Sequence, residues 1–245
     1  SDIKEGAMIK EYYNSEKNHD VLILGDCEVY ENISTVTMWE NYGISSYIRG
    51  SAEQLIWQSY YLLEDTLKYE KPQVVIVNVL AMTESDAKNE AYNRMTLDGM
   101  KLSKYKIASI KESMTEEENM ASYIFPLLRY HSRWSELSSE DFRYMWKTPS
   151  VTTNGYLMQK GVRPVTTIPK AAPLANYTFS DRNMEYLDKI YSLCKDNGIN
   201  LVLMKAPSVY PHWYDEWDKQ VSDYAYEHGI LYLNTINEAG NIGID

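Results

Sequence analysis

The chain has 245 residues, a length that allows one large α/β domain or two smaller ones, and 44% of its residues are hydrophobic, as in ordinary globular proteins. Its net charge is -11, with 24 Lys and Arg against 35 Asp and Glu. This acidity argues against binding to a nucleic-acid backbone or to an anionic membrane surface, because both require a basic face.

The first elements in chain order alternate between strands and helices. Val21 to Leu24 is a short apolar run that ends at Gly25, which is typical of a buried parallel strand. Ile44 to Arg49 is a second strand candidate, and Ala52 to Tyr69 carries apolar residues at helical spacing. Val74 to Leu80 is predicted as the next buried strand.

The same alternation of strands and helices is predicted again late in the chain. A helix is predicted around Met184 to Cys194, with Cys194 on its buried apolar stripe, and another over Trp213 to His228. Leu201 to Met204 and Ile230 to Leu233 are the last two strand candidates. This alternation predicts an α/β protein with a three-layer α/β/α architecture, whose flavodoxin-like parallel sheet has about five strands.

Residues 83–170 interrupt this alternation of strands and helices, because they contain polar helices and several turn residues. We interpret the stretch as an insertion within a single domain that spans residues 1–245. It either covers part of the carboxyl-end face of the sheet or forms a small subdomain.

The residues after the first predicted strand are the most informative for function. Ligands of open parallel sheets bind beyond the carboxyl ends of the strands, so Cys27 is expected to be exposed at this edge. Helix amides would favour its thiolate, whereas the neighbouring Asp26 and Glu28 disfavour a second negative charge. The alternative is a half-buried structural cysteine.

The block Gly25-Asp26-Cys27 resembles the Gly-Asp-Ser block of the SGNH (GDSL-type) esterase and acyltransferase family, with Cys27 in place of the nucleophilic serine. The run from Asp20 to Ser46 is similar to a bacterial branch of that family. Gly50 resembles the second-block glycine. Asn78 falls near the third-block asparagine, although Val77 stands where the family has glycine.

The resemblance implies an esterase or O-acyltransferase for acylated carbohydrate of the cell envelope, and hence an extracytoplasmic or cell-surface location. Cys27 would be the nucleophile, and Cys27, Gly50 and Asn78 would form the oxyanion hole. Asp26 and Glu28 would contact the substrate. The family's last block, an Asp followed three residues later by a His, is absent after the last predicted strand. We therefore expect this catalytic segment to follow residue 245, or the protein not to be a hydrolase.

Other candidate site residues lie outside these blocks. His212 is a candidate base, because it follows a predicted strand on the active face and has a carboxylate three residues further on. Arg129, His131 and Arg133 either bind a carboxylate or phosphate of the substrate or form a structural ion-paired cluster. Trp213, in an aromatic cluster, either stacks on a sugar or packs in the core.

The sequence carries no P-loop, no G-x-G-x-x-G pattern and no set of metal ligands, so we predict neither a cofactor nor a metal. It has no run of 18 apolar residues, so no membrane contact is expected within this segment. The expected partner is a small-molecule or carbohydrate ester. Two other functions stay open: an inactive carbohydrate-binding relative, and a cytosolic thiol-dependent or redox-sensing protein.

Overall fold

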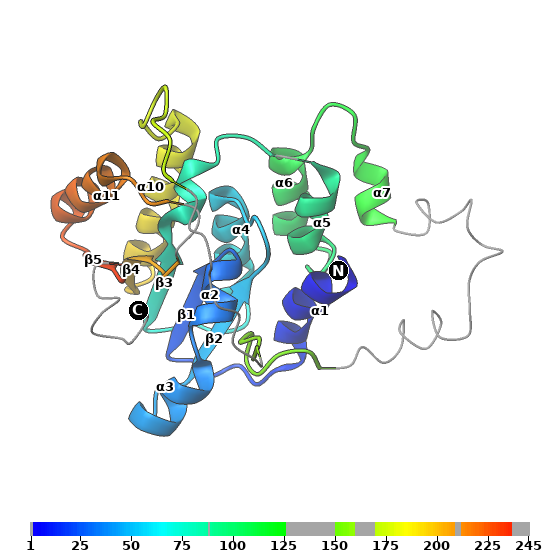
Figure 1. Cartoon of the computed structure of the whole chain (residues 1–245). Helices are drawn as coiled ribbons and strands as arrows, with labels where there is room; N and C mark the ends of the chain where they lie inside the picture. The colour runs from blue at the N-terminus through cyan, green and yellow to red at the C-terminus, as the bar shows by residue number, and fades with distance from the viewer. Residues whose placement is uncertain (1, 88, 126–149, 160–169, 209–211, 237–245) are drawn as a thin grey trace.

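Five parallel strands form the centre of the computed structural model (Figure 1), which describes residues 2–87, 89–125, 150–159, 170–208 and 212–236. Their order across the sheet is β2-β1-β3-β4-β5. This is the flavodoxin-like order, so the predicted three-layer α/β/α fold is confirmed. The strands are β1 (Val21–Gly25), β2 (Ser46–Gly50), β3 (Val74–Asn78), β4 (Asn200–Lys205) and β5 (Leu231–Asn234).

Both faces of the central strands are apolar, as a parallel sheet between two helix layers requires. In β1, Leu22 and Leu24 belong to the larger core, whereas Val21 and Ile23 belong to a smaller core on the opposite face. The register places Ile23 beside Ile76 of β3, so the alternation of faces continues across the sheet.

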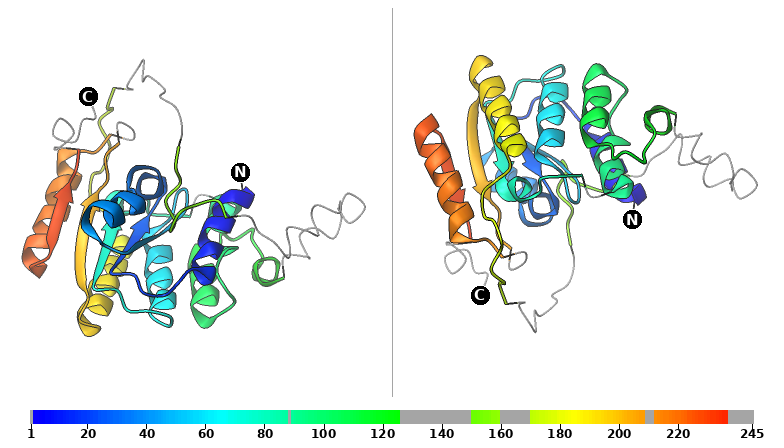
Figure 2. Two further views of the ribbon diagram at one scale, coloured as in Figure 1. Left: turned by 90° about the horizontal axis from the view of Figure 1, so that it is seen from below. Right: turned by 90° about the horizontal axis from the view of Figure 1, so that it is seen from above.

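The larger core lies under α4, α10 and α11, and the smaller one lies under α2, which contacts β1 and β2 (Figure 2). The longest of the described helices, α10, begins after Ser180, whose hydroxyl accepts a hydrogen bond from the Asn183 amide. The helices among the described residues are α1 (Asp2–Glu11), η1 (Tyr12–Asn14), α2 (Cys27–Asn32), α3 (Thr35–Tyr42), α4 (Ile56–Thr66), η2 (Val79–Thr83), α5 (Glu90–Leu97), α6 (Lys104–Ser113), α7 (Met120–Ile124), α10 (Asp181–Asp196) and α11 (Asp215–His228).

Two elements have bounds that differ from the prediction in ways that matter for the site. The third strand was expected to continue to Leu80, but it ends at Asn78 and the chain turns into η2. Asn78 is the last residue of β3 that pairs with β4, and Val79 is the first residue of η2. The first long helix begins at Ile56 rather than Ala52, which leaves a turn at the end of β2.

The described residues of 83–170 add no strand to the five-stranded sheet. Within this range, α5 packs against α1 and α6 packs against α4 (Figure 1). The segment 150–159 lies along the outer edge of β2, where the Ile48 amide donates to the Asn154 carbonyl at 3.0 Å. Gly155 allows this close approach, because a Cβ there would lie 2.0 Å from the Ile48 carbonyl oxygen.

Cys194 lies on the buried side of α10, as its place in the apolar stripe predicted. Its exposure is 1%, and it belongs to the larger core with Leu187 and Ile190. Burial raises the pKa of its thiol to about 12, so this cysteine is a neutral packing residue at physiological pH.

Candidate functional site

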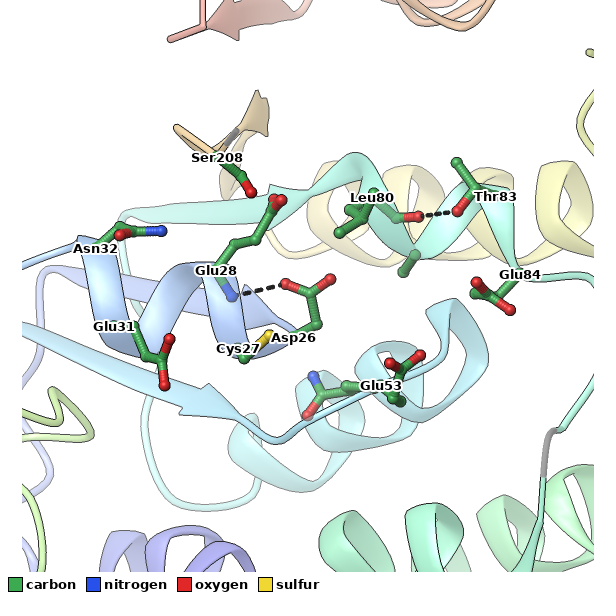
Figure 3. Close-up of a pocket in the computed structure, with 12 residues that line it drawn as sticks. Asp26, Cys27, Glu28, Glu31, Asn32, Glu53, Leu80, Thr83, Glu84 and Ser208 are labelled. Carbon is green, nitrogen blue, oxygen red and sulfur yellow. Dashed lines mark hydrogen bonds between the residues drawn. The ribbon is translucent and has the colours of Figure 1, made fainter. Parts of the chain in front are cut away.

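A pocket of about 360 Å³ opens at the carboxyl ends of β1 and β3 (Figure 3). This is the topological switch point of the sheet, where the strand order reverses. From β1 the chain moves to β2 on one side, and the following strand, β3, pairs with β1 on the other side. The walls come from the start of α2, the turn after β2, η2, and the segment after β4. The lining residues are Asp26, Cys27, Glu28, Glu31, Asn32, Glu53, Gln54, Leu80, Ala81, Thr83, Glu84 and Ser208.

Cys27 is the first residue of α2 and is half-buried in this pocket. Gly25 lets β1 pass close to β3 just before it, since a Cβ on Gly25 would lie 2.7 Å from the Asn78 Cβ. Asp26 then starts the helix, with its Oδ1 accepting a hydrogen bond from the Glu28 amide at 3.0 Å. The end of β1, the Asp26 cap and the first turn of α2 therefore place the thiol of Cys27 in the pocket.

A buried polar network lies beside the thiol. The Lys205 ammonium is fully buried and donates to both carboxylate oxygens of Glu28 at 2.8 Å, and to the Ala206 carbonyl at 2.7 Å. Asn78 Nδ2 donates to Glu28 Oε2 at 2.9 Å and to Asp26 Oδ1 at 3.1 Å. The Ala206 amide donates to Asn78 Oδ1 at 2.9 Å. The Glu28 carboxylate is thus paired with a buried cation, whereas the Asp26 carboxylate accepts hydrogen bonds from two neutral amides.

The network makes Asp26 an unusual acid. Burial, together with the nearby negative charge of Glu28, raises the pKa of Asp26 to about 7. The hydrogen bond from the Glu28 amide, the charge of Lys205 and the hydrogen bond from Asn78 oppose this rise. Asp26 therefore changes its protonation state near neutral pH.

The Asp26→Asn variant is expected to lose the part of the free energy of unfolding that depends on the protonation of Asp26. The pKa of Asp26 is about 7 in the folded state against a reference of 3.8, so the folded state binds more protons between these values. Wild-type stability relative to the variant should therefore rise by about 1–3 kcal/mol as pH falls from 8 to 5. Asparagine keeps the helix cap. Urea unfolding of both proteins at several pH values measures the difference, and a difference that does not vary with pH would contradict this prediction.

The same surroundings suppress ionisation of Cys27. Burial raises the pKa of its thiol to about 12, and the negative charges of Asp26, Glu31, Glu28 and Glu53 add to the rise. The thiol is therefore protonated at neutral pH. A positive charge would favour the thiolate, and no Lys, Arg or His is among the described residues that line the pocket.

The residues expected in the oxyanion hole are close to Cys27 in the fold, but their hydrogen-bond donors are directed elsewhere. Asn78 Nδ2 is engaged by Asp26 and Glu28, and Asn78 does not line the pocket. Gly50 is the last residue of β2, level with Gly25. The amide of Ser51 donates to Gly25, and that of Ile48 donates outward to Asn154. Because amides alternate along a strand, the Gly50 amide shares the outward direction of Ile48.

The two candidates that follow β4 lie apart from the thiol. His212 is exposed, does not line the pocket, and has its ring against that of Tyr214 at a centroid distance of 4.6 Å. Trp213 is 8% exposed and belongs to the larger core, where its indole nitrogen donates to Asp218 Oδ1 at 3.1 Å. Trp213 therefore packs under the sheet edge instead of facing the pocket. Arg129, His131 and Arg133 lie outside the described residues.

Several residues of the site were not singled out by the sequence. Glu31 and Glu53 line the pocket, and Lys205 lies buried behind it. For Lys205 a signal existed, because a charged residue directly ends the apolar run of β4 at the edge where ligands bind. For the two glutamates no local pattern distinguishes them from ordinary surface carboxylates.

The pocket is rich in hydrogen-bond acceptors. Five of its twelve lining residues are Asp or Glu. In the part of the chain that the structure describes, no group of three or more His, Cys, Asp or Glu side chains is arranged to hold a metal ion. The described lining of the pocket is therefore acidic.

The described helices include none with the length and apolar composition needed to cross a lipid bilayer. Comparison of the chain with models of known protein families, with curated proteins and with solved structures found no match.

Proposed function

We propose that this protein is an SGNH-like domain that hydrolyses or transfers O-acyl groups of carbohydrate, with Cys27 as the acyl acceptor. One observation carries the proposal: the Cys27 thiol lines the pocket at the switch point of the sheet, at the first residue of the helix that follows β1. The resemblance of Gly25-Asp26-Cys27 to the family's nucleophile block agrees with this position. It also favours cell-envelope carbohydrate as the substrate and an extracytoplasmic location.

The proposed reaction has two steps. The Cys27 sulfur attacks the ester carbonyl carbon, the bond to the sugar oxygen breaks, and the thiol proton passes to that oxygen as the alcohol leaves. Water or a second hydroxyl group then attacks the thioester and returns a proton to the sulfur. The backbone amide of Cys27, the first residue of α2, stabilises the negative oxygen of each intermediate, and such an amide is typically worth about 10²–10³ in rate.

A second candidate is a binding protein for acylated or free carbohydrate that performs no chemistry. The observation that favours it is the environment of the thiol, where burial and the surrounding negative charges raise the pKa of Cys27 to about 12. A permanently protonated thiol is a weak nucleophile but a satisfactory lining residue. In this case the carboxylates serve only as acceptors for sugar hydroxyl groups.

Substitution of Cys27 in the full-length gene product separates the two candidates. The wild type is expected to release acid from aryl esters and acetylated sugars, and Cys27→Ala to lose at least about 10³ of that rate. Cys27→Ser should retain part of it. Full activity in Cys27→Ala would overturn the nucleophile role.

If the wild type hydrolyses no ester, the catalytic proposal fails. Calorimetric titration with acetylated oligosaccharides then tests the binding candidate, for which wild type and Cys27→Ala should bind equally.

A further inference from the structure

A group of lysine and tyrosine side chains lies on the surface of the domain, apart from the pocket that holds Cys27. Three segments supply it: η1, the residues that follow α4, and the start of α6 with the turn before it. Helices α4 and α6 pack side by side, which brings the second and third segments together (Figure 1). The lysine–tyrosine surface, as we name it, consists of Tyr13, Lys68, Tyr69, Lys101, Lys104 and Tyr105.

Contacts between ammonium groups and rings join these residues into one surface. The Lys68 ammonium lies 5.3 Å from the ring centre of Tyr69 and 5.5 Å from that of Tyr105. The Lys101 ammonium lies 4.7 Å from the ring centre of Tyr13 and 5.9 Å from that of Tyr69. The Lys101 amide also donates to the Tyr13 hydroxyl at 3.1 Å, so the turn before α6 is fixed against η1.

The lysines of this surface contact aromatic rings where other lysines of the chain contact carboxylates. The Lys104 ammonium lies 5.0 Å from the ring centre of the next residue, and neither Lys101 nor Lys104 has a carboxylate at ion-pairing distance among the described residues. Lys189 on α10 and Lys219 on α11 each lie 2.6 Å from a carboxylate oxygen. An aromatic ring attracts an ammonium group but does not cancel its charge.

The carboxylates beside the surface belong to the interior. Asp65 is fully buried and is shared by Arg49 at 3.2 Å and Lys68 at 3.5 Å. The Glu70 side chain is 4% exposed and lies 2.9 Å from a buried histidine. Glu64 is half-buried and interacts with a lysine of the surface only at longer range. The exposed charge of this face is therefore that of its lysines, although the whole chain has a net charge of -11.

We propose that the lysine–tyrosine surface binds the carboxylate groups of an acidic polysaccharide. Its three exposed lysines are spread over two segments, so they suit charges spaced along a chain better than one compact anion. The hydroxyl groups of Tyr69 and Tyr105 have no hydrogen-bond partner among the described residues, so they can bind hydroxyl groups of the same sugar chain. A nucleic acid fits less well, because its dense phosphates would be repelled by the acidic remainder of the protein.

The choice of a carbohydrate rests on the proposed function, whereas the lysine–tyrosine surface itself does not depend on it. None of its six residues lines the pocket that holds Cys27. Binding of the polysaccharide and chemistry at the sulfur can therefore be measured separately.

Calorimetric titration of the protein with oligogalacturonate tests the proposal. The wild type should bind, and its affinity should fall as NaCl is raised from about 50 to about 200 mM, because salt screens exposed charges. Lys68→Gln/Lys101→Gln/Lys104→Gln should bind at least about 10-fold more weakly, since three ion pairs with the ligand are lost. The corresponding triple arginine variant keeps the three charges and should bind within about 3-fold of the wild type.

The matched control is Lys189→Gln/Lys195→Gln/Lys219→Gln, which changes the net charge equally on α10 and α11 and should leave the affinity unchanged. Cys27→Ala should bind like the wild type, so the result does not depend on ester hydrolysis. Equal affinity in the two glutamine variants, or no binding by the wild type, overturns the proposal. Tighter binding of a single-stranded oligonucleotide of the same charge also overturns it, because the surface would then be assigned to nucleic acid.

Discussion

Replacing Lys205 with methionine is expected to lower the free energy of unfolding by about 3–5 kcal/mol at pH 7. Lys205 is fully buried, and its ammonium lies 2.8 Å from both carboxylate oxygens of Glu28. Methionine fills a similar volume but leaves Glu28 without its cation, next to Asp26 and with the Asn78 amide as a shared neutral donor. Breaking a buried pair by removing one partner is costly, because an uncompensated charge remains.

The double variant Lys205→Met/Glu28→Gln is the control for this prediction. It removes both charges and keeps an amide that accepts from Asn78, so most of the lost stability should return. The single variant should also recover stability as pH falls below 7, since Asp26, with a pKa of about 7, is then protonated and no longer repels Glu28. Urea unfolding at pH 7 and pH 5 measures both effects. A loss below about 1 kcal/mol in Lys205→Met would show that the pair is dispensable.

The fold was predictable because its signals are local. The apolar run before Gly25 and the run from Val74 have the composition of strands that are buried on both faces. Gly229 directly follows α11 with φ at 64°, as a helix end requires. With strands and helices in alternation, short right-handed connections leave few possible strand orders. The order β2-β1-β3-β4-β5 is one of them.

The site was predictable only for residues that lie next to a recognisable element in the sequence. Asp26 and Cys27 follow a recognisable strand, and the pocket forms around them. Lys205 is separated from its partner Glu28 by 177 positions, and the sequence around either residue does not predict that the two form an ion pair. Trp213 has the aromatic ring of a sugar-stacking residue, but it belongs to the larger core, and its indole nitrogen donates to Asp218, five positions further on.

A second buried ion pair, between β2 and α4, is expected to hold the N-terminal helix to the domain. Arg49 and Asp65 are both fully buried, and Arg49 donates to Asp65 Oδ2 at 3.2 and 3.3 Å. The guanidinium also donates to the Leu62 carbonyl at 3.0 Å, and it lies 4.2 Å from the ring centre of Tyr12. Arg49 therefore links β2 and α4 to η1, which directly follows α1.

The Arg49→Met variant is expected to lose about 3–5 kcal/mol of unfolding free energy, because Asp65 stays buried without its main cation. Amide hydrogen exchange should then accelerate first in α1 (Asp2–Glu11) and η1, since Tyr12 and Tyr13 both lose their contact with the guanidinium. In Arg49→Met/Asp65→Asn the unpaired charge is gone, so part of the stability should return while α1 still exchanges faster. Exchange in α1 at the wild-type rate in both variants would show that its other contacts hold this helix, among them the hydrogen bonds from Val151 and Thr152 to Glu11. Arg49 would then serve only as the buried partner of Asp65.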